Sequence, residues 1–380
     1  MPDHLPESLA KVRKQMFDFA ATVLLPLEQQ RQAGEIALAS LHEQVRSASR
    51  NDGFFFRTQP EEFGGNPAGA LELTMLREML AATNTPLASS VLGPGPGLLH
   101  AAEGHLRQAY LDPVMRGEKR GAFGFTEPDS APRPSWAVLD GDTLSVTGQK
   151  SYVTGGASCD FVCILVNVEG VDGDKLGTAM VVVDREATGV KIDRTFISME
   201  GGGHVSMTFS DVKVPVSQVI GKIGEGMPRA LGNIGNVRLM IAAQAMGMCL
   251  WTLDFVEAHL RAPHRTGTPL GDQQGVRLRY ADMRIETYAA RSALYRTARL
   301  VESGENSVNE VISAKIFCTE TAGRVIDTAV QLVGGQALVQ GHPLEALYRQ
   351  VRSLRLVEGA NDLLRLNLVK GRLALDKGRV

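Results

Sequence analysis

The hydrophobic period of this sequence changes twice along the chain, and this change constrains the fold more than any other feature. Residues 1 to about 120 have helical composition, with helices predicted over Glu7–Leu25, ending at Pro26, and over Gly69–Ala82. From about 121 to 225 apolar residues alternate with polar ones, as at Val205, Met207 and Phe209. A period of two predicts strands, and the glycine-rich turns between these runs predict a small all-β module.

From about residue 226 the helical pattern returns and stays. The clearest stripe steps by three and four through Val276, Tyr280, Met283, Thr287, Ala290, Leu294 and Ala298. A capping box at Ser307–Glu310 predicts the start of another helix, which Gly334-Gly335 would end. Long helices in series predict a bundle.

These zones predict an α+β multidomain chain. We expect an N-terminal α-helical domain over 1–120, a central β-barrel or sandwich over 121–225, and a C-terminal four-helix-bundle-like domain over 226–380. Strands and helices do not alternate, and no GxGxxG follows a strand, which argues against a dinucleotide-binding Rossmann sheet.

Composition and charge argue against some classes of binding partner. A net charge of −2 over 380 residues gives no field for gathering nucleic acid, and no basic run indicates a membrane surface. We see neither a secretory signal nor an apolar run of the roughly 20 residues that a membrane span needs, so we expect a cytoplasmic protein. Four cysteines without metal-ligand spacing are interpreted as buried thiols, and no metal is expected.

Five short motifs follow one another along the chain. They are Pro60–Gly65 (PEEFGG), Phe123–Pro128 (FGFTEP), Gly148–Thr154 (GQKSYVT), Gln331–Gly335 (QLVGG) and Val357–Gly359 (VEG). In this order they resemble the acyl-CoA dehydrogenase family, whose members also combine helical and β domains. Leu354-Arg355-Leu356 further resembles the branch of that family with Leu-Arg-Leu-x-Asp/Glu-Gly near the C-terminus.

The resemblance implies FAD-dependent α,β-dehydrogenation of an acyl-CoA to the 2-enoyl-CoA. Glu358 would remove the α-proton while the flavin N5 accepts the β-hydride. A carboxylate becomes an effective base when desolvation raises its pKa, and Leu354, Leu356 and Val357 give Glu358 apolar neighbours. From spacing alone, Glu358 is more typical of a surface residue near a helix start, and the resemblance favours the catalytic interpretation.

The resemblance also assigns the surroundings of this base. Gly359 would admit the substrate closely, and Arg238 matches an arginine kept near the base. The Glu358 backbone N–H would donate to the thioester oxygen. Some relatives place the base at the position of Val237, which cannot act as one.

Flavin contacts are implied residue by residue. Phe123, Phe125 and Thr126 would line the isoalloxazine, Tyr152 would replace a tryptophan beside the ring, and the Thr154 hydroxyl would reach the N5 region. Gln331, Gly334 and Gly335 would approach the FAD of a neighbouring subunit, and Gln273 matches another cofactor-side position. Strand aromatics and a Gly-Gly helix stop are also common in proteins without a cofactor.

Three departures from the family pattern are visible. A cofactor-contacting serine falls on Pro132, a pyrophosphate-binding arginine falls on Pro263, with Arg261 or Arg265 as its replacement, and the residue after Glu-Gly is Ala360. Alternatives therefore include an acyl-CoA oxidase, a dehydrogenase of carrier-protein-bound acyl groups, a flavin monooxygenase and a non-catalytic flavin-binding subunit. The expected partners are an electron-transfer flavoprotein and further copies of this chain, in a dimer or tetramer.

Overall fold

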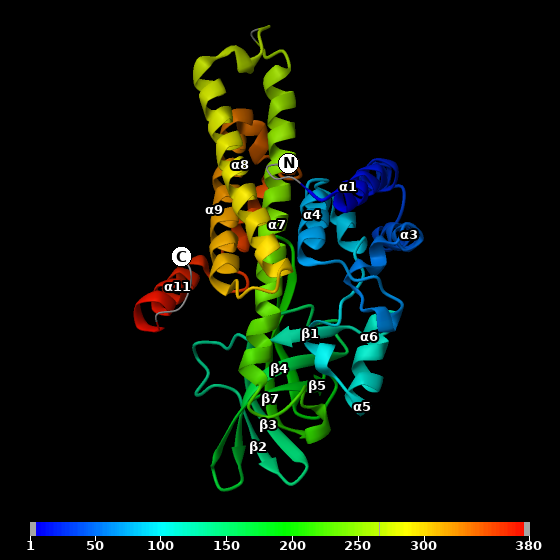
Figure 1. Cartoon of the computed structure of the whole chain (residues 1–380), viewed down its shortest axis with the longest axis vertical. Coiled ribbons are helices and arrows are strands. Elements are labelled where there is room, and N and C mark those ends of the chain that lie inside the picture. Colours follow the sequence, from blue (N-terminus) through cyan, green and yellow to red (C-terminus); the bar gives the residue numbers. More distant parts are fainter. Residues whose placement is uncertain (1–4, 266, 376–380) are drawn as a thin grey trace. The chain divides into compact units, whose positions relative to one another are not determined.

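The computed structural model describes residues 5–265 and 267–375, which divide into two compact units (Figure 1). The helical unit comprises residues 1–58, 65–93 and 235–380, and the sheet unit comprises residues 59–64 and 94–234. The division of the chain into three domains at residues 120 and 225 remains a proposal.

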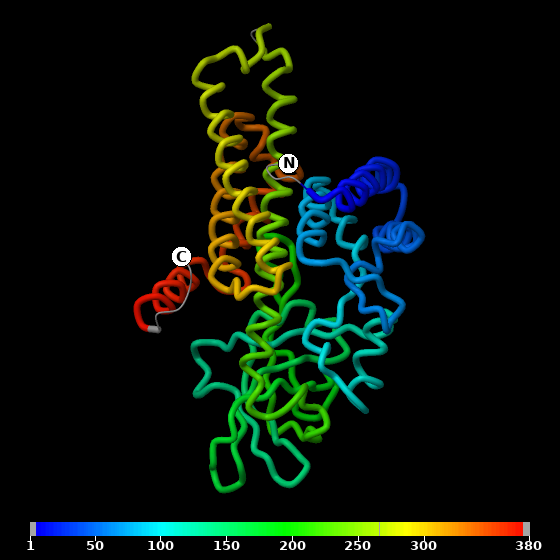
Figure 2. Tube along the Cα trace, viewed as in Figure 1, coloured from blue at the N-terminus to red at the C-terminus, as the bar shows by residue number. Residues whose placement is uncertain are grey.

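Helices from both ends of the chain share the core of the helical unit. Figure 2 shows how the chain returns, so that α4 near the beginning runs beside α7. The helices of this unit are α1 (Glu7–Phe19), α2 (Leu25–Ala33), α3 (Leu38–Asn51), α4 (Ala70–Ala81), α8 (Gln274–Glu302), α9 (Val308–Val333), α10 (Pro343–Leu354) and α11 (Asn361–Leu375), with most of α7 (Gly226–Arg261).

The predicted helical stripe is confirmed in α8. Met283, Thr287, Ala290 and Leu294 are buried on one face of this helix. On the same unit, the buried Glu78 carboxylate of α4 accepts hydrogen bonds from Arg291 (2.7 and 2.8 Å) and Tyr295 (2.8 Å) of α8. Apolar packing and this buried ion pair together join α4 to α8.

Two local predictions in this unit were wrong. The first helix does not end at Pro26, because a π-helical turn (Ala20–Leu24) follows α1 and places Pro26 in the first turn of α2. There the missing proline N–H removes no helical hydrogen bond. The helix predicted from Ser307 does form as α9, but the Ser307 side chain makes no capping hydrogen bond.

The helix α7 contains a long apolar stretch. By length and composition alone, α7 could cross a membrane, whereas the sequence predicted no apolar run of that length. Most of its apolar stretch is buried within the protein, as is common in core helices of globular proteins.

The sheet unit contains seven strands in one sheet, in the order β1-β4-β2-β3-β7-β6, with β5 paired to β4. Their bounds are β1 (Gly121–Gly124), β2 (Trp136–Asp140), β3 (Thr143–Thr154), β4 (Phe161–Gly170), β5 (Lys175–Asp184), β6 (Val190–Ile197) and β7 (Gly203–Pro215). Short helical segments α5 (Gly104–Leu106) and α6 (Asp112–Arg116) also belong to this unit.

The sequence of β4 is almost continuously apolar because successive side chains point to opposite faces of the strand and both faces are buried. Phe161 and Cys163 pack into a core with residues 98–115, whereas Val162 and Ile164 pack into the core shared by the other strands. A strand buried on both faces carries apolar residues at every position. The four cysteines are buried free thiols, as predicted.

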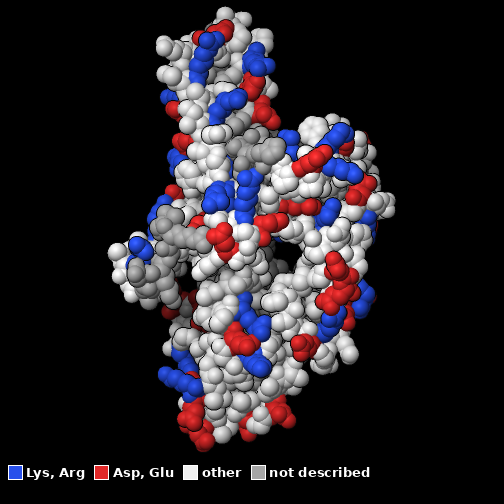
Figure 3. All heavy atoms as spheres, in the orientation of Figure 1, with Lys and Arg blue, Asp and Glu red and all other residues white. Residues whose placement is uncertain are grey.

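Charged side chains are mixed over the surface. On the face in Figure 3, Lys and Arg are interspersed with Asp and Glu. Among the described residues, no group of three or more His, Cys, Asp or Glu side chains is placed to hold a metal ion.

Candidate active site

Glu358 lies in the turn between α10 and α11, and its backbone is strained. Its φ angle is 54° and that of Gly359 is 100°, so two successive residues are left-handed. For a residue with a side chain this conformation costs on the order of 1–2 kcal/mol and persists only where the surroundings enforce it. Such strain concentrates at functional sites.

The Glu358 side chain is half-buried. Burial raises the pKa of its carboxyl, and the positive charges of Arg238 and Lys315 oppose this rise. Of the apolar neighbours predicted for it, Leu354 is buried and Val357 packs against the core. Leu356 is 56% exposed.

Two cations bind the main chain of this turn. Arg238 of α7 donates from Nε to the carbonyl oxygen of Glu358 at 3.0 Å, and Lys315 of α9 donates from Nζ to that of Gly359 at 3.0 Å. Both cations lie close enough to Glu358 to influence its carboxyl electrostatically. Within the helical unit, the structure thus brings Glu358, Gly359 and Arg238 together.

Sequence reasoning missed Lys315. Its signal was a lysine within an apolar helical stripe, because Val311, Lys315, Cys318 and Ala322 step by four, three and four and are all buried. A lysine at such a position must be paired or hydrogen-bonded inside the protein.

In the sheet unit, the motif residues Phe123, Phe125 and Thr126 lie along β3. Ser151 N donates to Thr126 O at 2.8 Å, which places Thr126 beside Tyr152. The Phe123 and Phe125 rings are 5.8 Å apart and partly buried against the core formed with residues 98–115. The two motifs from residues 123–128 and 148–154 are therefore neighbours in space.

Tyr152 presents its ring outward from a β-bulge. The pairing of β3 with β7 shifts register between Lys150 and Val153, and Tyr152 has a φ of 55°. Its side chain is 65% exposed and meets the Phe196 ring edge-on, with centroids 5.6 Å apart. Bulges of this kind redirect a side chain beside functional sites.

Phe196 and His204 extend this surface, and neither was singled out from the sequence. The Phe196 and His204 rings stack with centroids 5.7 Å apart, and the Thr154 hydroxyl lies 3.1 Å from His204 Nδ1. They come from β6 and β7, paired so that Phe196 and Thr154 both lie opposite His204. Pairing of this kind could be found only from the register of the sheet.

An ion pair with a buried lysine fixes the loop that follows Thr126, in which Pro132 replaces the serine of the family pattern. Lys150 is 1% exposed and donates to Glu127 Oε1 and to Leu165 O, both at 2.7 Å. Glu127 also accepts from Ser135 N at 2.8 Å. The glutamate of the FGFTEP motif thus anchors the segment up to Ser135.

The remaining predicted cofactor residues lie on the helical unit. Gln273 precedes α8 and Arg265 is in the α7–α8 connection. Gln331 lies in the last turn of α9, and Gly334 and Gly335 follow that helix. Gln331, Gly335, Gln273 and Arg265 are exposed. The connection after α9 lies near the end of α7, because His342 meets the Phe255 ring at 5.7 Å.

An exposed surface of aromatic rings and hydroxyls suits a planar ring system with a polar edge, and the half-buried carboxyl suits proton transfer. These features, on a helical unit and a β-sheet unit, are compatible with an oxidoreductase that binds a flavin, as the motifs of the sequence predict. FAD fits the donor and aromatic set of the sheet unit, in which Tyr152, Thr126 and Thr154 are all exposed.

Comparisons with known proteins agree with this class. The sequence matches the acyl-CoA dehydrogenase N-terminal domain over residues 6–118 and the acyl-CoA dehydrogenase C-terminal domain over residues 224–373. The short-chain specific acyl-CoA dehydrogenase of Clostridium acetobutylicum is 30% identical over 273 residues, which cover 70% of this chain and 72% of that protein. The chain therefore belongs to the acyl-CoA dehydrogenase family.

Two further similarities span nearly the whole chain. The CarC subunit of the caffeyl-CoA reductase-Etf complex of Acetobacterium woodii is 26% identical over 373 residues, covering 95% of this chain and 97% of that one. The structure of butyryl-CoA dehydrogenase from Megasphaera elsdenii aligns with a TM-score of 0.80 and 23% identity, covering 99% and 100% of the two chains. As a member of this family, the chain is an oxidoreductase acting on acyl-CoA with FAD as its cofactor.

Proposed function

We propose that this chain oxidises an acyl-CoA to the 2-enoyl-CoA, with Glu358 as the base that accepts the α-proton. The observation that carries the proposal is the half-buried Glu358 carboxyl. Burial raises its pKa, and two cations hydrogen-bond the carbonyl oxygens of Glu358 and Gly359. FAD supplies the acceptor for the β-hydride. The substrate loses one proton and one hydride, which leaves a double bond conjugated with the thioester.

The two cations act differently on the backbone and on the carboxyl. Their hydrogen bonds go to the carbonyl oxygens of Glu358 and Gly359, so they fix the direction of the turn. Their charges also favour the ionised carboxyl, which opposes the rise in pKa that burial causes. A base that is desolvated but still ionised at the working pH accepts a proton readily.

We assign the flavin to the surface of Phe123, Phe125, Thr126, Tyr152 and Thr154, to which the structure adds Phe196 and His204. Tyr152 is strained by its left-handed backbone yet exposed, as a ring held ready for a planar partner would be. Thr126 and Thr154 offer hydroxyls to the polar edge of that partner. Gly359 and Arg238 would border the substrate.

We further propose that Arg265, Gln273, Gln331, Gly334 and Gly335 contact the FAD of a second copy of this chain. An exposed apolar stripe supports self-association, since Leu278, Ile285 and Tyr288 of α8 are each more than 60% exposed at helical spacing. Apolar helix faces of this kind are normally covered by a partner. Dimer and tetramer both satisfy this requirement.

An electron-transfer flavoprotein is the proposed acceptor of the electrons, and the cytoplasm is the proposed compartment. The CarC relative is named as a subunit of a complex with Etf. That relative is also named as a reductase, which favours the reverse reaction, reduction of a 2-enoyl-CoA, as the second candidate. Mixing prereduced enzyme with 2-enoyl-CoA and measuring flavin reoxidation without oxygen tests this direction.

The direct test uses purified protein with FAD, mixed anaerobically with acyl-CoAs from short to long and branched. We expect the flavin absorbance to bleach and 2-enoyl-CoA to form. Glu358→Gln should slow bleaching by about 10²–10⁴-fold, the usual contribution of a general base. Glu286→Gln, which alters an exposed pair with Arg324, is the matched control.

Two results would contradict the proposal. Bleaching at the wild-type rate in Glu358→Gln would exclude Glu358 as the base. Failure of every acyl-CoA and every 2-enoyl-CoA to change the flavin spectrum would exclude both directions of the reaction.

A further inference from the structure

Lys315 is a fully buried lysine that donates no hydrogen bond to the carboxyl of the proposed base. Its side chain has no exposed surface, although an ammonium group is strongly hydrated in water. A buried charge is tolerated only when hydrogen bonds and opposite charge replace that hydration. The groups around Lys315 therefore indicate what it stabilises.

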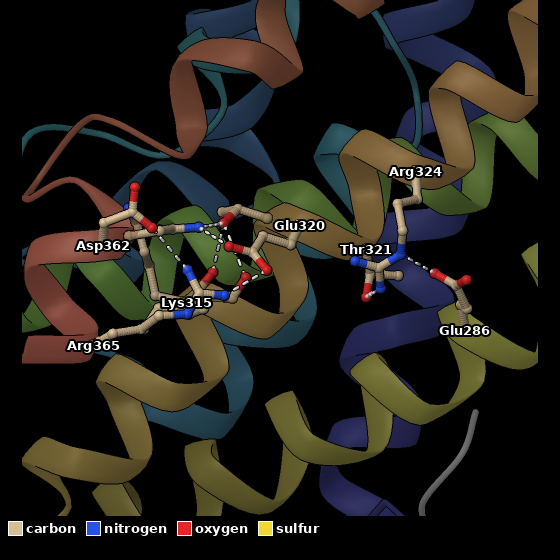
Figure 4. Close-up of polar contacts among 10 residues, drawn as sticks. Glu286, Lys315, Glu320, Thr321, Arg324, Asp362 and Arg365 are labelled. Atoms are coloured by element: carbon tan, nitrogen blue, oxygen red, sulfur yellow. Dashed lines mark hydrogen bonds and ion pairs between the residues drawn. The ribbon is translucent and has the colours of Figure 1, made fainter. Parts of the chain in front are cut away.

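The Lys315 ammonium makes two hydrogen bonds at the Glu358 turn. Nζ donates to Gly359 O at 3.0 Å and to Asn361 Oδ1 at 2.9 Å. Asn361, itself 4% exposed, donates from Nδ2 to Thr319 Oγ1 at 3.1 Å and to Glu320 Oε1 at 3.3 Å. Figure 4 shows this group of contacts around Lys315, Glu320, Asp362 and Arg365, where α9 meets α11.

The turn has little freedom between these contacts. At Gly359, a Cβ would lie 3.2 Å from Leu364 and 3.4 Å from Arg238, and the φ of 100° disfavours any side chain. Glu358 is left-handed without being glycine, so its conformation must be enforced from outside. Arg238 holds the carbonyl of Glu358 from α7, and Lys315 holds the next carbonyl from α9.

We propose that Lys315 is the positioning residue of the proposed base: its buried ammonium holds the Glu358–Gly359 turn in its left-handed form and sets the charge around the Glu358 carboxyl. This inference rests on the proposed function of Glu358. Lys315 touches the main chain behind the base, so it acts through Glu358.

The charged groups facing Lys315 come from several elements. Burial and, to a smaller extent, Arg238 of α7 lower the pKa of Lys315, whereas Glu358 and Glu320 raise it, and the net result is a pKa of about 8. Glu320 forms an ion pair with Arg365 of α11 at 2.7 Å, so its negative charge acts on both Arg365 and Lys315. Lys315 therefore carries its charge at neutral pH and loses it in the mildly alkaline range, where the unfolded chain would keep it.

The test compares Lys315→Met with Arg324→Met in the full-length holoenzyme. Methionine keeps the length of the side chain but removes the charge and the donors. Arg324 lies on the same helix and pairs with Glu286 at 2.8 Å on the exposed side of α9, away from Lys315 (Figure 4). The control thus removes one cation from α9 without altering the turn.

The first readout is independent of activity. Amide hydrogen exchange, followed by mass spectrometry, should rise about tenfold or more over residues 355–361 in Lys315→Met and stay unchanged in Arg324→Met. The Asn361 amide reports directly, because it donates to Arg355 O at 2.9 Å across the turn. Wild-type protection of this segment in Lys315→Met would overturn the positioning role.

The second readout is exchange of the acyl-CoA α-proton in D₂O, measured over a range of pH. Lys315→Met should reduce its turnover at least tenfold with little change in KM, and move its acid limb to higher pH, because a charge that favours ionised Glu358 is lost. If the acid limb does not move and the turnover of Lys315→Met equals that of Arg324→Met, Lys315 has no effect on the base.

If Lys315→Met does not fold, Asn361→Ser removes one acceptor of the ammonium and keeps the charge. It should then loosen the 355–361 segment without moving the acid limb, and an unchanged segment would overturn the inference. If wild-type protein shows neither α-proton exchange nor flavin bleaching, the proposed function fails, and hydrogen exchange still decides whether Lys315 holds the turn.

Discussion

Gly247 allows α7 and α4 to pack closely, and replacing it with alanine gives a sharp test of this packing. A Cβ at position 247 would lie 2.2 Å from Glu78 O, 2.6 Å from Ala81 Cβ and 2.9 Å from Ala82 N. Ordinary contacts begin near 3.4 Å, and backbone atoms cannot rotate away. Gly247→Ala must therefore move α4 and α7 apart by about an ångström.

Two opposing effects determine the sign of the change in stability. Alanine favours a helix over glycine by about 1 kcal/mol. Overpacking a core typically costs about 1–3 kcal/mol, and a clash with backbone belongs at or above the upper end of that range. We expect a net loss of about 2 kcal/mol, because the clash exceeds the gain in helix propensity.

Gly323 in α9 provides the matched control, because a Cβ there meets nothing within 4 Å. Gly323→Ala should stabilise the protein by up to about 1 kcal/mol. Thermal unfolding followed by circular dichroism should show the midpoint of Gly247→Ala about 4–8 °C below wild type. If Gly247→Ala is as stable as Gly323→Ala, the close approach of α4 to α7 is wrong.

Three further predictions concern the site and its assembly. The acid limb of α-proton exchange should lie above pH 4.5, because burial raises the pKa of Glu358 and the base acts only above that pKa; a limb at or below 4.5 in the measured pH profile would contradict this. Tyr152→Ala should weaken FAD binding at least tenfold, measured by flavin fluorescence, whereas Tyr348→Ala on α10 should leave it unchanged; equal affinities would remove Tyr152 from the flavin surface. Ile285→Lys should lower the mass measured by light scattering, because it puts a charge into the exposed stripe of α8; an unchanged mass would show that another surface joins the copies.

The sequence predicted the features that depend on local periodicity. The strand β7 and the helix α8 were visible because their apolar residues repeat with the period of the element, and α4 because of its helical composition. The end of the first helix was predicted wrongly at Pro26, because a π-helical turn precedes this proline and places it in the first turn of α2. Such a turn has no periodic signal in the sequence. The candidate base was found through a short motif, not through its environment.

The surroundings of that base depend on contacts between distant parts of the chain. Arg238, Lys315 and Glu358 come from α7, α9 and the α10–α11 turn, and their hydrogen bonds link residues up to 120 positions apart. Neither the left-handed φ of Glu358 nor the burial of Lys315 can be read from composition. The same applies to Phe196 and His204, which join Tyr152 only through strand register.

A turn is a flexible place for the proposed base, and contacts from two long helices support it. Glu358 sits between helices, where an unsupported left-handed residue would relax. Arg238 and Lys315 bind the turn from the long helices α7 and α9, so the packing of these helices restricts the motion of the turn. Catalytic groups must be held to within a fraction of an ångström, which is more easily achieved by fixing the backbone than by adding contacts to the carboxylate, since contacts to the carboxylate would lower the basicity it needs.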